Sequence, residues 1–94
     1  MSYKLEFEEH ALKEFNKLCA PVREQFKKKL YDILLNPHIP ANRLHGMTDC
    51  YKIKLRSAGY RLVYRVIDNE VVVLVLAVGK RERSEVYKAA KDRL

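Results

Sequence analysis

The sequence predicts an α+β fold, in which a small, largely antiparallel sheet carries a helical hairpin on one face and a short helix at the carboxyl end. Two patterns indicate this class. Two adjacent stretches near the amino end have apolar residues at helical spacing, whereas three later stretches alternate or run apolar as strands do. The 94 residues, 48% of them hydrophobic, are enough for one domain with a modest core, which we expect to span residues 1–94.

The amino-terminal third predicts a strand followed by two helices. Tyr3, Leu5 and Phe7 alternate with charged residues, which is the period of a half-buried strand. From Glu8 to Leu18 the period becomes helical, and Pro21 suits the first turn of a second helix. The apolar faces expected to be buried are Ala11, Leu12, Phe15 and Leu18 in the first helix and Val22, Phe26, Leu30, Ile33 and Leu34 in the second.

The central part predicts a loop and a β-hairpin. Asn36-Pro37 ends the second helix, and the segment up to Asp49 has no sustained period, so we expect a loop there. A turn at residues 57–59 separates two strands. The first strand has Tyr51, Ile53 and Leu55 on one side and Lys52, Lys54 and Arg56 on the other, and the second, Tyr60 to Ile67, has Arg61, Val63 and Arg65 on a common face.

The carboxyl-terminal part predicts the central strand and a last helix. Residues 68–70 form a turn, and the run Val71–Val78 is almost wholly apolar, as expected of a strand that is buried on both faces. We expect Gly79 to end this strand and Ser84 to cap the last helix. The inward side of that helix would comprise Val86, Ala89 or Ala90, and Leu94. The predicted order is therefore β-α-α-β-β-β-α.

Charge is the most informative part of the composition. Nineteen Lys and Arg residues against twelve Asp and Glu give a net charge of +7, which favours polyanionic partners such as nucleic acid. Residues 1–49 hold eight basic and seven acidic side chains, a net +1, whereas residues 50–94 hold eleven and five, a net +6. Nearly the whole excess therefore lies in the carboxyl-terminal half.

Several classes of protein are not expected. The chain does not open with a basic-then-apolar leader, and its longest apolar run is far shorter than the roughly 20 residues of a membrane span. We therefore expect a cytoplasmic protein without a membrane partner. Cys19 and Cys50 lack CxxC spacing, and His10, His38 and His45 lie far apart, so we expect no disulfide framework, no metal and no cofactor.

Strand alternation gathers basic residues on the sheet face that points away from the helical hairpin. Like charges on neighbouring strands repel each other, and a phosphate bound between them would relieve that repulsion. The alternative is a solvated basic surface without a ligand. The residues of this face would be Lys52, Lys54, Arg56, Arg61 and Arg65.

The segment from Gly79 to Tyr87 adds a pattern suited to single-stranded RNA. Arg81 and Arg83 offer forked guanidinium groups for phosphate, and Tyr87 can stack on an unpaired base. Alternatively, Arg83 pairs with a neighbouring glutamate and Tyr87 only anchors the helix to the sheet. Because residues 50–94 contain no histidine, a nuclease here would need another base, and a lysine among other cations can serve when repulsion lowers its pKa.

Together these residues resemble the RelE toxins of the RelE/ParE superfamily, which belong to bacterial type II toxin–antitoxin systems. The resemblance covers essentially the whole chain and is most specific in residues 22–25, 27–30, 49–57, 59–64 and 78–87. It implies a RelE-like fold and a metal-independent endoribonuclease, an mRNA interferase, that enters the A site of the 70S ribosome against 16S rRNA. There it would cut the mRNA codon by attack of a 2′-hydroxyl on the adjacent phosphate. The resemblance also implies a RelB-like antitoxin as inhibitor, through which alone the toxin would reach operator DNA.

The resemblance assigns roles to particular residues. Lys52 and Lys54 match paired lysines that act on the 2′-hydroxyl and the scissile phosphate, with Lys54 the better general base. Arg61 matches an arginine that stabilises the transition-state phosphate, Arg81 one assigned to the leaving group, and Tyr87 a tyrosine that stacks on a codon base. The RNA-binding residues would be Arg56, Arg65, Lys80, Arg83 and His45.

His45 departs from the family pattern, because close members carry arginine there. Histidine weakens a phosphate contact at neutral pH, or alternatively introduces a second acid–base group. Two rival functions stay open. One is a ParE-like poison of DNA gyrase, against which the joint presence of the five catalytic candidates argues. The other is a nucleic-acid-binding module without catalysis, such as a corepressor.

Overall fold

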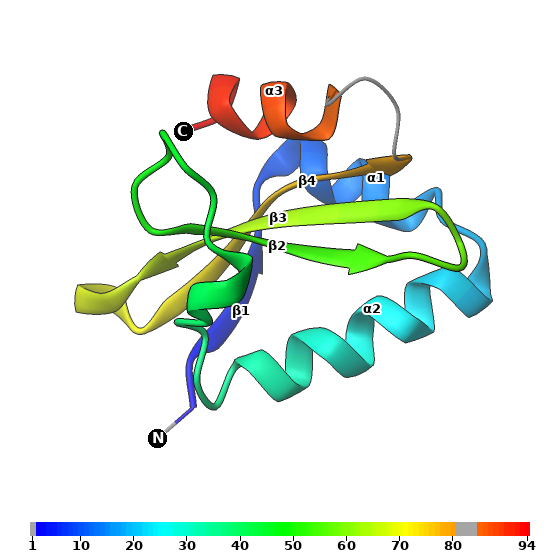
Figure 1. Cartoon of the computed structure of the whole chain (residues 1–94). Coiled ribbons are helices and arrows are strands. Elements are labelled where there is room, and N and C mark those ends of the chain that lie inside the picture. Colours follow the sequence, from blue (N-terminus) through cyan, green and yellow to red (C-terminus); the bar gives the residue numbers. More distant parts are fainter. Residues whose placement is uncertain (1, 81–84) are drawn as a thin grey trace.

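The computed structural model describes residues 2–80 and 85–94 (Figure 1). Its order of elements confirms the predicted α+β class and the succession β-α-α-β-β-β-α. Short 3₁₀ turns at Pro40–Asn42 and Asp68–Glu70 lie in the connections before β2 and β4. The helices and strands are β1 (Lys4–Phe7), α1 (Glu9–Asn16), α2 (Ala20–Ile33), β2 (Cys50–Leu55), β3 (Tyr60–Ile67), β4 (Val72–Lys80) and α3 (Glu85–Asp92).

The strands form one sheet in the order β1-β4-β3-β2. β1 is parallel to β4, whereas β4 and β3, and β3 and β2, are antiparallel. The apolar strand β4 therefore lies inside the sheet, as predicted, and β2 lies at an edge. The sheet is largely antiparallel, which is also as predicted.

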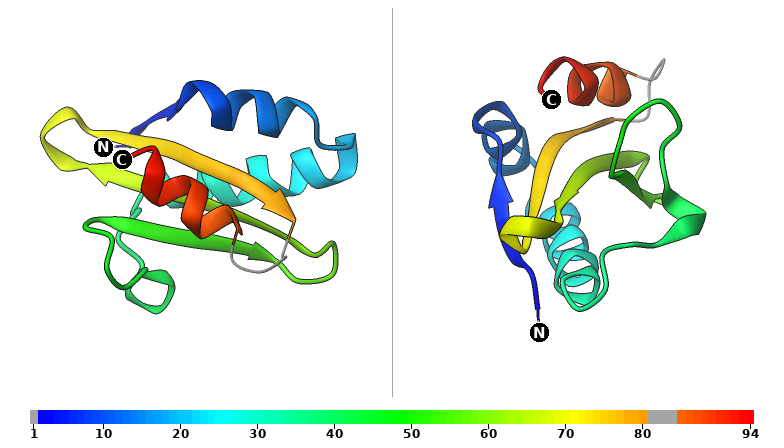
Figure 2. Two further views of the ribbon diagram at one scale, coloured as in Figure 1. Left: turned by 90° about the horizontal axis from the view of Figure 1, so that it is seen from above. Right: turned by 90° about the vertical axis from the view of Figure 1, so that its left-hand side faces the viewer.

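Helices α1 and α2 cover one face of the sheet (Figure 2). Glu8 caps α1 by accepting the N–H groups of His10 and Ala11, and Pro21 lies in the first turn of α2, as its fixed φ allows. One apolar cluster joins the two helices to the sheet, and it confirms the predicted hairpin. Its helical members are Ala11, Phe15, Leu18, Val22, Phe26, Leu30 and Ile33, with Leu34 partly buried against it.

Helix α3 packs on the opposite face, together with part of the loop before β2 (Figure 2). Val86 and Ala90 of α3 are buried as predicted, and Ala89 is partly buried beside them. This second cluster includes Met47 of the loop and, in the sheet, Cys50, Val63, Leu76 and Ala77. Only part of this face is therefore open to a ligand.

A β-bulge in β4 lies where the strand packs against α3. Val63 pairs with Ala77 and Tyr64 with Val75, so Leu76 is the extra residue, and both Leu76 and Ala77 pack toward α3. Farther along the strand, an added Cβ on Gly79 would approach Cγ2 of Val86 to 3.1 Å. The absence of a side chain at Gly79 thus makes room for the start of α3.

Two predictions of burial are wrong. Leu12 is 44% exposed, because the buried face of α1 is centred on Ala11 and Phe15, which are one turn apart. Leu94 is 51% exposed, because α3 ends at Asp92 and the last residue lies beyond it.

Both predicted ends of the central strand are also wrong. Gly79 does not end β4, since Gly79 pairs with Arg61 and Lys80 with Tyr60. Val71 does not begin it, because Val71 has a φ of 56° and its N–H donates to the carbonyl of Asp68 at 3.1 Å. The left-handed residue thus closes the turn before β4 begins. The predicted cap, Ser84, lies outside the described residues.

Candidate active site

The β2–β3 hairpin places three cations on the sheet face that α3 shares. Alternate residues of β2 are buried beneath α2, so the side chains of Lys52 and Lys54 project from the other face. Lys54 lies directly across the ladder from Arg61, and side chains in such pairs are about 5 Å apart at Cβ. The predicted gathering of Lys52, Lys54 and Arg61 is therefore confirmed, while their catalytic roles stay predictions.

Tyr87 of α3 lies next to the same arginine. The guanidinium carbon of Arg61 is 5.3 Å from the centroid of the Tyr87 ring, a cation–π distance. Tyr87 also packs against the apolar cluster under α3, so it anchors the helix and holds Arg61 at once. We call Lys52, Lys54, Arg61 and Tyr87 the site cluster.

The cations of the site cluster repel one another. Within residues 2–80 and 85–94, none of the ion pairs involves Lys52, Lys54 or Arg61. The charge of Lys52 is the largest cause that lowers the pKa of Lys54 below its usual 10.5, followed by desolvation and by Arg61. A lowered pKa leaves more of the amine neutral near pH 7, which a general base requires. The direction of this pKa shift is the one expected for a lysine among other cations.

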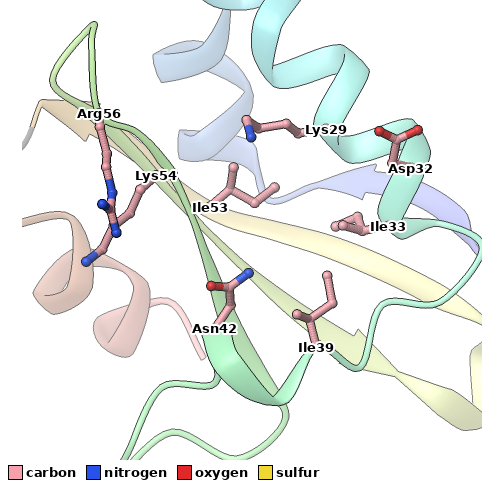
Figure 3. A pocket seen from close by; sticks show the side chains of 8 residues that line it. All are labelled: Lys29, Asp32, Ile33, Ile39, Asn42, Ile53, Lys54 and Arg56. Atoms are coloured by element: carbon pink, nitrogen blue, oxygen red, sulfur yellow. The ribbon is translucent and has the colours of Figure 1, made fainter.

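A hollow of about 260 Å³ opens beside Lys54 and Arg61, and Arg56 and Tyr60 also line it. The sequence predicts Arg56 within the strand, but β2 ends at Leu55 and Arg56 is exposed in the turn. It nevertheless lies alongside Lys54 (Figure 3). Tyr60 pairs with Leu55, and the sequence pattern does not indicate it as a residue of the site. Pairing the two strands outward from the turn at Gly59 would have placed Tyr60 next to Lys54 and Arg61.

The end of β4 lies next to this hollow. Lys80 is exposed and is the Cα partner of Tyr60. Arg81 and Arg83 lie outside the described residues, so their predicted contributions to leaving-group chemistry and RNA binding stay predictions.

Two other predicted RNA-binding residues lie apart from the site cluster. Arg65 pairs with Cys50, four residues along β3 from Arg61, which is about 13 Å at the usual strand rise. His45 is exposed in the loop before β2 and lines a separate hollow. Strand alternation puts Arg65 on the same face as Arg61, as predicted. The separation along β3 is too large, however, for Arg65 to join the basic residues around Lys54.

Metal ligation has no visible support in the described part of the chain, where no three His, Cys, Asp or Glu side chains gather. His38 instead lies between Asp68 and Tyr51, with ring nitrogens 2.7 and 3.1 Å from their oxygens. Cys19 is exposed and Cys50 buried, both as free thiols, and burial raises the pKa of Cys50 to about 11. No described helix is long and apolar enough to cross a membrane.

The arrangement suits a phosphodiester with an unpaired base. A phosphate beside Lys52 and Arg61 would neutralise cations that have no described partner, and the amine of Lys54 could accept a proton from a nearby hydroxyl. The ring of Tyr87 offers an aromatic surface next to the same arginine.

Comparison with known proteins finds relatives that match the chain over most or all of its length. The family model that matches residues 5–85 describes the ParE toxin of the type II toxin–antitoxin system parDE. The mRNA interferase toxin RelE of Escherichia coli strain K12 is 65% identical over 94 residues, which are 100% of this chain and 99% of that protein.

Solved structures show the same fold. The R81A/R83A mutant of E. coli toxin RelE in the free state has a TM-score of 0.93 and 63% identity, over 100% of this chain and 99% of that chain. A chain of the intact E. coli RelBE toxin–antitoxin complex has a TM-score of 0.84 and 65% identity, over 87% of this chain and 100% of that chain. The likeness confirms the fold that the sequence predicts.

Proposed function

The chain belongs to the RelE/ParE family of type II toxin–antitoxin toxins, with RelE toxins as its close relatives, and on this premise we propose that it is an mRNA interferase. It is a metal-independent endoribonuclease that acts on the codon in the ribosomal A site. The observation that carries the proposal is the position of Lys54, whose pKa Lys52 and Arg61 lower in a site without histidine.

The proposed reaction begins with removal of a proton. The neutral amine of Lys54 takes the proton of a 2′-hydroxyl, and that oxygen attacks the adjacent phosphorus. The bond from phosphorus to the 5′-oxygen of the next nucleotide breaks, which leaves a 2′,3′-cyclic phosphate and a 5′-hydroxyl. Lys52 and Arg61 stabilise the charge that develops on the phosphate oxygens. Arg81 is proposed to protonate the leaving oxygen or to stabilise its charge.

Tyr87 orients the substrate in this proposal. Its ring stacks on a base of the codon, and its contact with Arg61 links the position of that base to the position of the phosphate. The ribosome supplies the remaining orientation by presenting the codon, and orientation accounts for a large share of the barrier reduction in such reactions.

The test is primer extension on translated message, with and without ribosomes. We expect cuts inside A-site codons only when ribosomes are present, and a cleavage rate lower by orders of magnitude for Arg81→Ala. Lys28→Gln serves as the matched control, because Lys28 is exposed on α2 and does not line the hollow beside Lys54 and Arg61. Intact message with ribosomes present would sink the proposal. Inhibition of DNA gyrase in a parallel supercoiling assay would then favour a ParE-like poison, and RNA binding alone a non-catalytic module.

A RelB-like antitoxin is the second part of the proposal. A relative that is 65% identical has been solved as a toxin–antitoxin complex, and the +7 charge of this chain favours an acidic partner. Copurification of the chain with such an antitoxin, and loss of message cleavage in the complex, are the expected results. A complex that still cuts message would contradict inhibition.

A further inference from the structure

A second hollow lies between α2 and the edge strand β2, next to the site cluster (Figure 3). Its volume is about 360 Å³, within the range of roughly 300–1,000 Å³ that small-ligand pockets occupy. Ile33 of α2, Ile53 of β2 and Ile39 of the intervening loop form its apolar floor. Side chains from three separate segments thus converge on one hollow, which we call the α2–β2 groove.

The rim of the α2–β2 groove is polar and has two unlike ends. Lys54 and Arg56 run alongside each other at one end, and the amine of Lys29 points toward that end from α2 (Figure 3). Asp32 lies at the other end, and Asn42 directs its amide into the groove. A single phosphate suits the cationic end, whereas Asp32 repels a second phosphate at the other end.

The groove is continuous with the site cluster. Lys29, Lys54 and Arg56 also line a neighbouring hollow under the β2–β3 turn, and Lys54 and Arg56 line the hollow that contains Arg61. Three adjoining hollows therefore share the same cations. They form a path from Arg61, over the edge of the sheet, to α2.

We propose that the α2–β2 groove binds one unpaired nucleotide of the message, on the 3′ side of the A-site codon that is cut. Its phosphate lies between Lys29 and Arg56, so that the amine of Lys54 stays available to the site cluster, and its base packs on the isoleucine floor. The amide of Asn42 hydrogen-bonds the edge of that base. The occupant is message, because the cationic path runs directly from the site cluster. The inference rests on the proposed function, since it takes message as the RNA.

Free phosphate and a nucleic-acid duplex both fit the groove less well than a single nucleotide does. Free phosphate would use the cationic end but would leave the isoleucine floor uncovered. A duplex is too wide for a hollow of this volume, and its bases are stacked and paired rather than free to enter. A single unpaired nucleotide uses the floor, the amide and the cations together.

The isoleucines offer a direct test. The chain contains four, and only Ile67, at the end of β3, lies outside the groove lining. Isoleucine-methyl NMR of the free chain is titrated with a 2′-O-methylated RNA trinucleotide, which cannot undergo 2′-hydroxyl attack. We expect saturable shifts of the Ile33, Ile39 and Ile53 methyls without a shift of Ile67, and none of these shifts with inorganic phosphate alone. Unmoved floor methyls, or equal movement of all four, would overturn the proposal.

Charge variants give a second readout. Lys29→Gln should weaken trinucleotide binding and reduce by about 0.7 the slope of log affinity against log salt, as expected for one lost phosphate contact to a single strand. Lys28→Gln is the matched control, because Lys28 is the exposed neighbour on the same helix and does not line these hollows. Asn42→Ala should weaken binding without changing the slope. Equal effects of Lys29→Gln and Lys28→Gln would contradict a local site.

Ribosome assays identify the source of the nucleotide. Lys29→Gln should raise KM for message cleavage and leave kcat unchanged, and this difference should vanish when the message is trimmed to end at the A-site codon. A KM effect that persists on trimmed message would mean that ribosomal RNA fills the groove, which overturns the proposal. Absence of cleavage by the unaltered chain would instead refute the proposed function, and the NMR titration is independent of cleavage.

Discussion

Lys54 owes its chemical character to its neighbours in the sheet rather than to burial alone. The antiparallel register sets it opposite Arg61, and strand alternation keeps Lys52 on the same face. Lys52 is the largest cause of its lowered pKa, and Arg56 is the last of the causes. The alternation in the sequence predicts this clustering, since period 2 depends only on local geometry. The cross-strand partner depends on where the turn begins, and the pattern places that start one residue too late, after Arg56 instead of after Leu55.

Cleavage should therefore depend on pH through Lys54. Its neutral form increases as pH rises, so the rate should rise along a limb that lies below the usual lysine pKa of 10.5. Lys52→Gln removes the largest cause of the lowering, which raises the pKa of Lys54 and moves this limb to higher pH. Single-turnover cleavage of ribosome-bound message across a pH series measures the shift. Arg56→Gln should move the limb less, in the same direction. A Lys52→Gln profile that falls without moving would contradict Lys54 as the base.

Val71 and Gly59 both lie in turns that require a left-handed backbone. Both have positive φ, 56° at Val71 and 70° at Gly59, but only glycine accepts that region without strain. Left-handed backbone costs a residue with a Cβ about 1–2 kcal/mol. Val71→Gly should therefore raise the free energy of unfolding by roughly 1 kcal/mol, and Gly59→Ala should lower it by a similar amount. Urea denaturation measures both changes, and a destabilised Val71→Gly variant would show that burial of the valine outweighs the strain.

Helix α3 is fastened to the rest of the molecule near both ends. Val86 lies against Gly79 near its start. Just beyond its last residue, Arg93 donates from Nη1 and Nη2 to the carboxylate of Glu14 at 2.7 and 3.1 Å, and from Nη1 to the carbonyl of Leu76 at 2.9 Å. The Glu14 carboxylate is the main cause that raises the pKa of Arg93. Since α3 carries Tyr87, this ion pair holds a residue of the site cluster in position.

Arg93→Ala should loosen α3 more than the sheet. Hydrogen bonds to charged groups contribute about 1.5–3 kcal/mol each, so we expect amide exchange in residues 85–92 to accelerate by at least about tenfold while β3 stays protected. Arg93→Lys should restore the exchange only partly, because lysine lacks the forked geometry. Hydrogen-exchange mass spectrometry gives the readout, and a matching loss of message cleavage is expected because Tyr87 moves with the helix. Unchanged exchange in α3 would show that apolar packing alone holds it.

The elements differ in how far the sequence predicts them. The apolar period of α2 is long enough to identify both the helix and its buried face, and the alternation of β2 is equally direct. The last residue of β4 was not predictable in this way, because its pairing depends on the bulge at Leu76, which arises from contact with β3. The Glu14–Arg93 pair spans almost the whole chain and has no local signature. In α1, eight residues are too few for periodicity to distinguish Leu12 from its buried neighbours.

For RNA binding by the whole molecule, we expect the location of the basic side chains to matter more than the net charge. Residues 50–94 hold most of the net charge of +7. The fold divides that excess, because the strand length separates Arg65 from Arg61, and it adds Lys29 of the amino-terminal half to the path around Lys54. A count along the chain could not reveal either change, since both depend on which segments become neighbours.

Two triple variants of equal net charge test this conclusion. The first variant combines Lys52→Gln, Lys54→Gln and Arg56→Gln, which reduces the net charge from +7 to +4. The second variant has the same net charge and combines Lys13→Gln, Lys17→Gln and Lys28→Gln. These three lysines are exposed, in α1, at the carboxyl end of α1 and in α2, respectively. Binding of an uncleavable RNA oligonucleotide is followed by fluorescence anisotropy across a salt series. The first variant should flatten the slope of log affinity against log salt by about 2, at roughly 0.7 for each lost phosphate contact, whereas the second should leave it nearly unchanged. If both variants flatten the slope equally, RNA responds to the overall charge, and the cations around Lys54 are not a distinct binding surface.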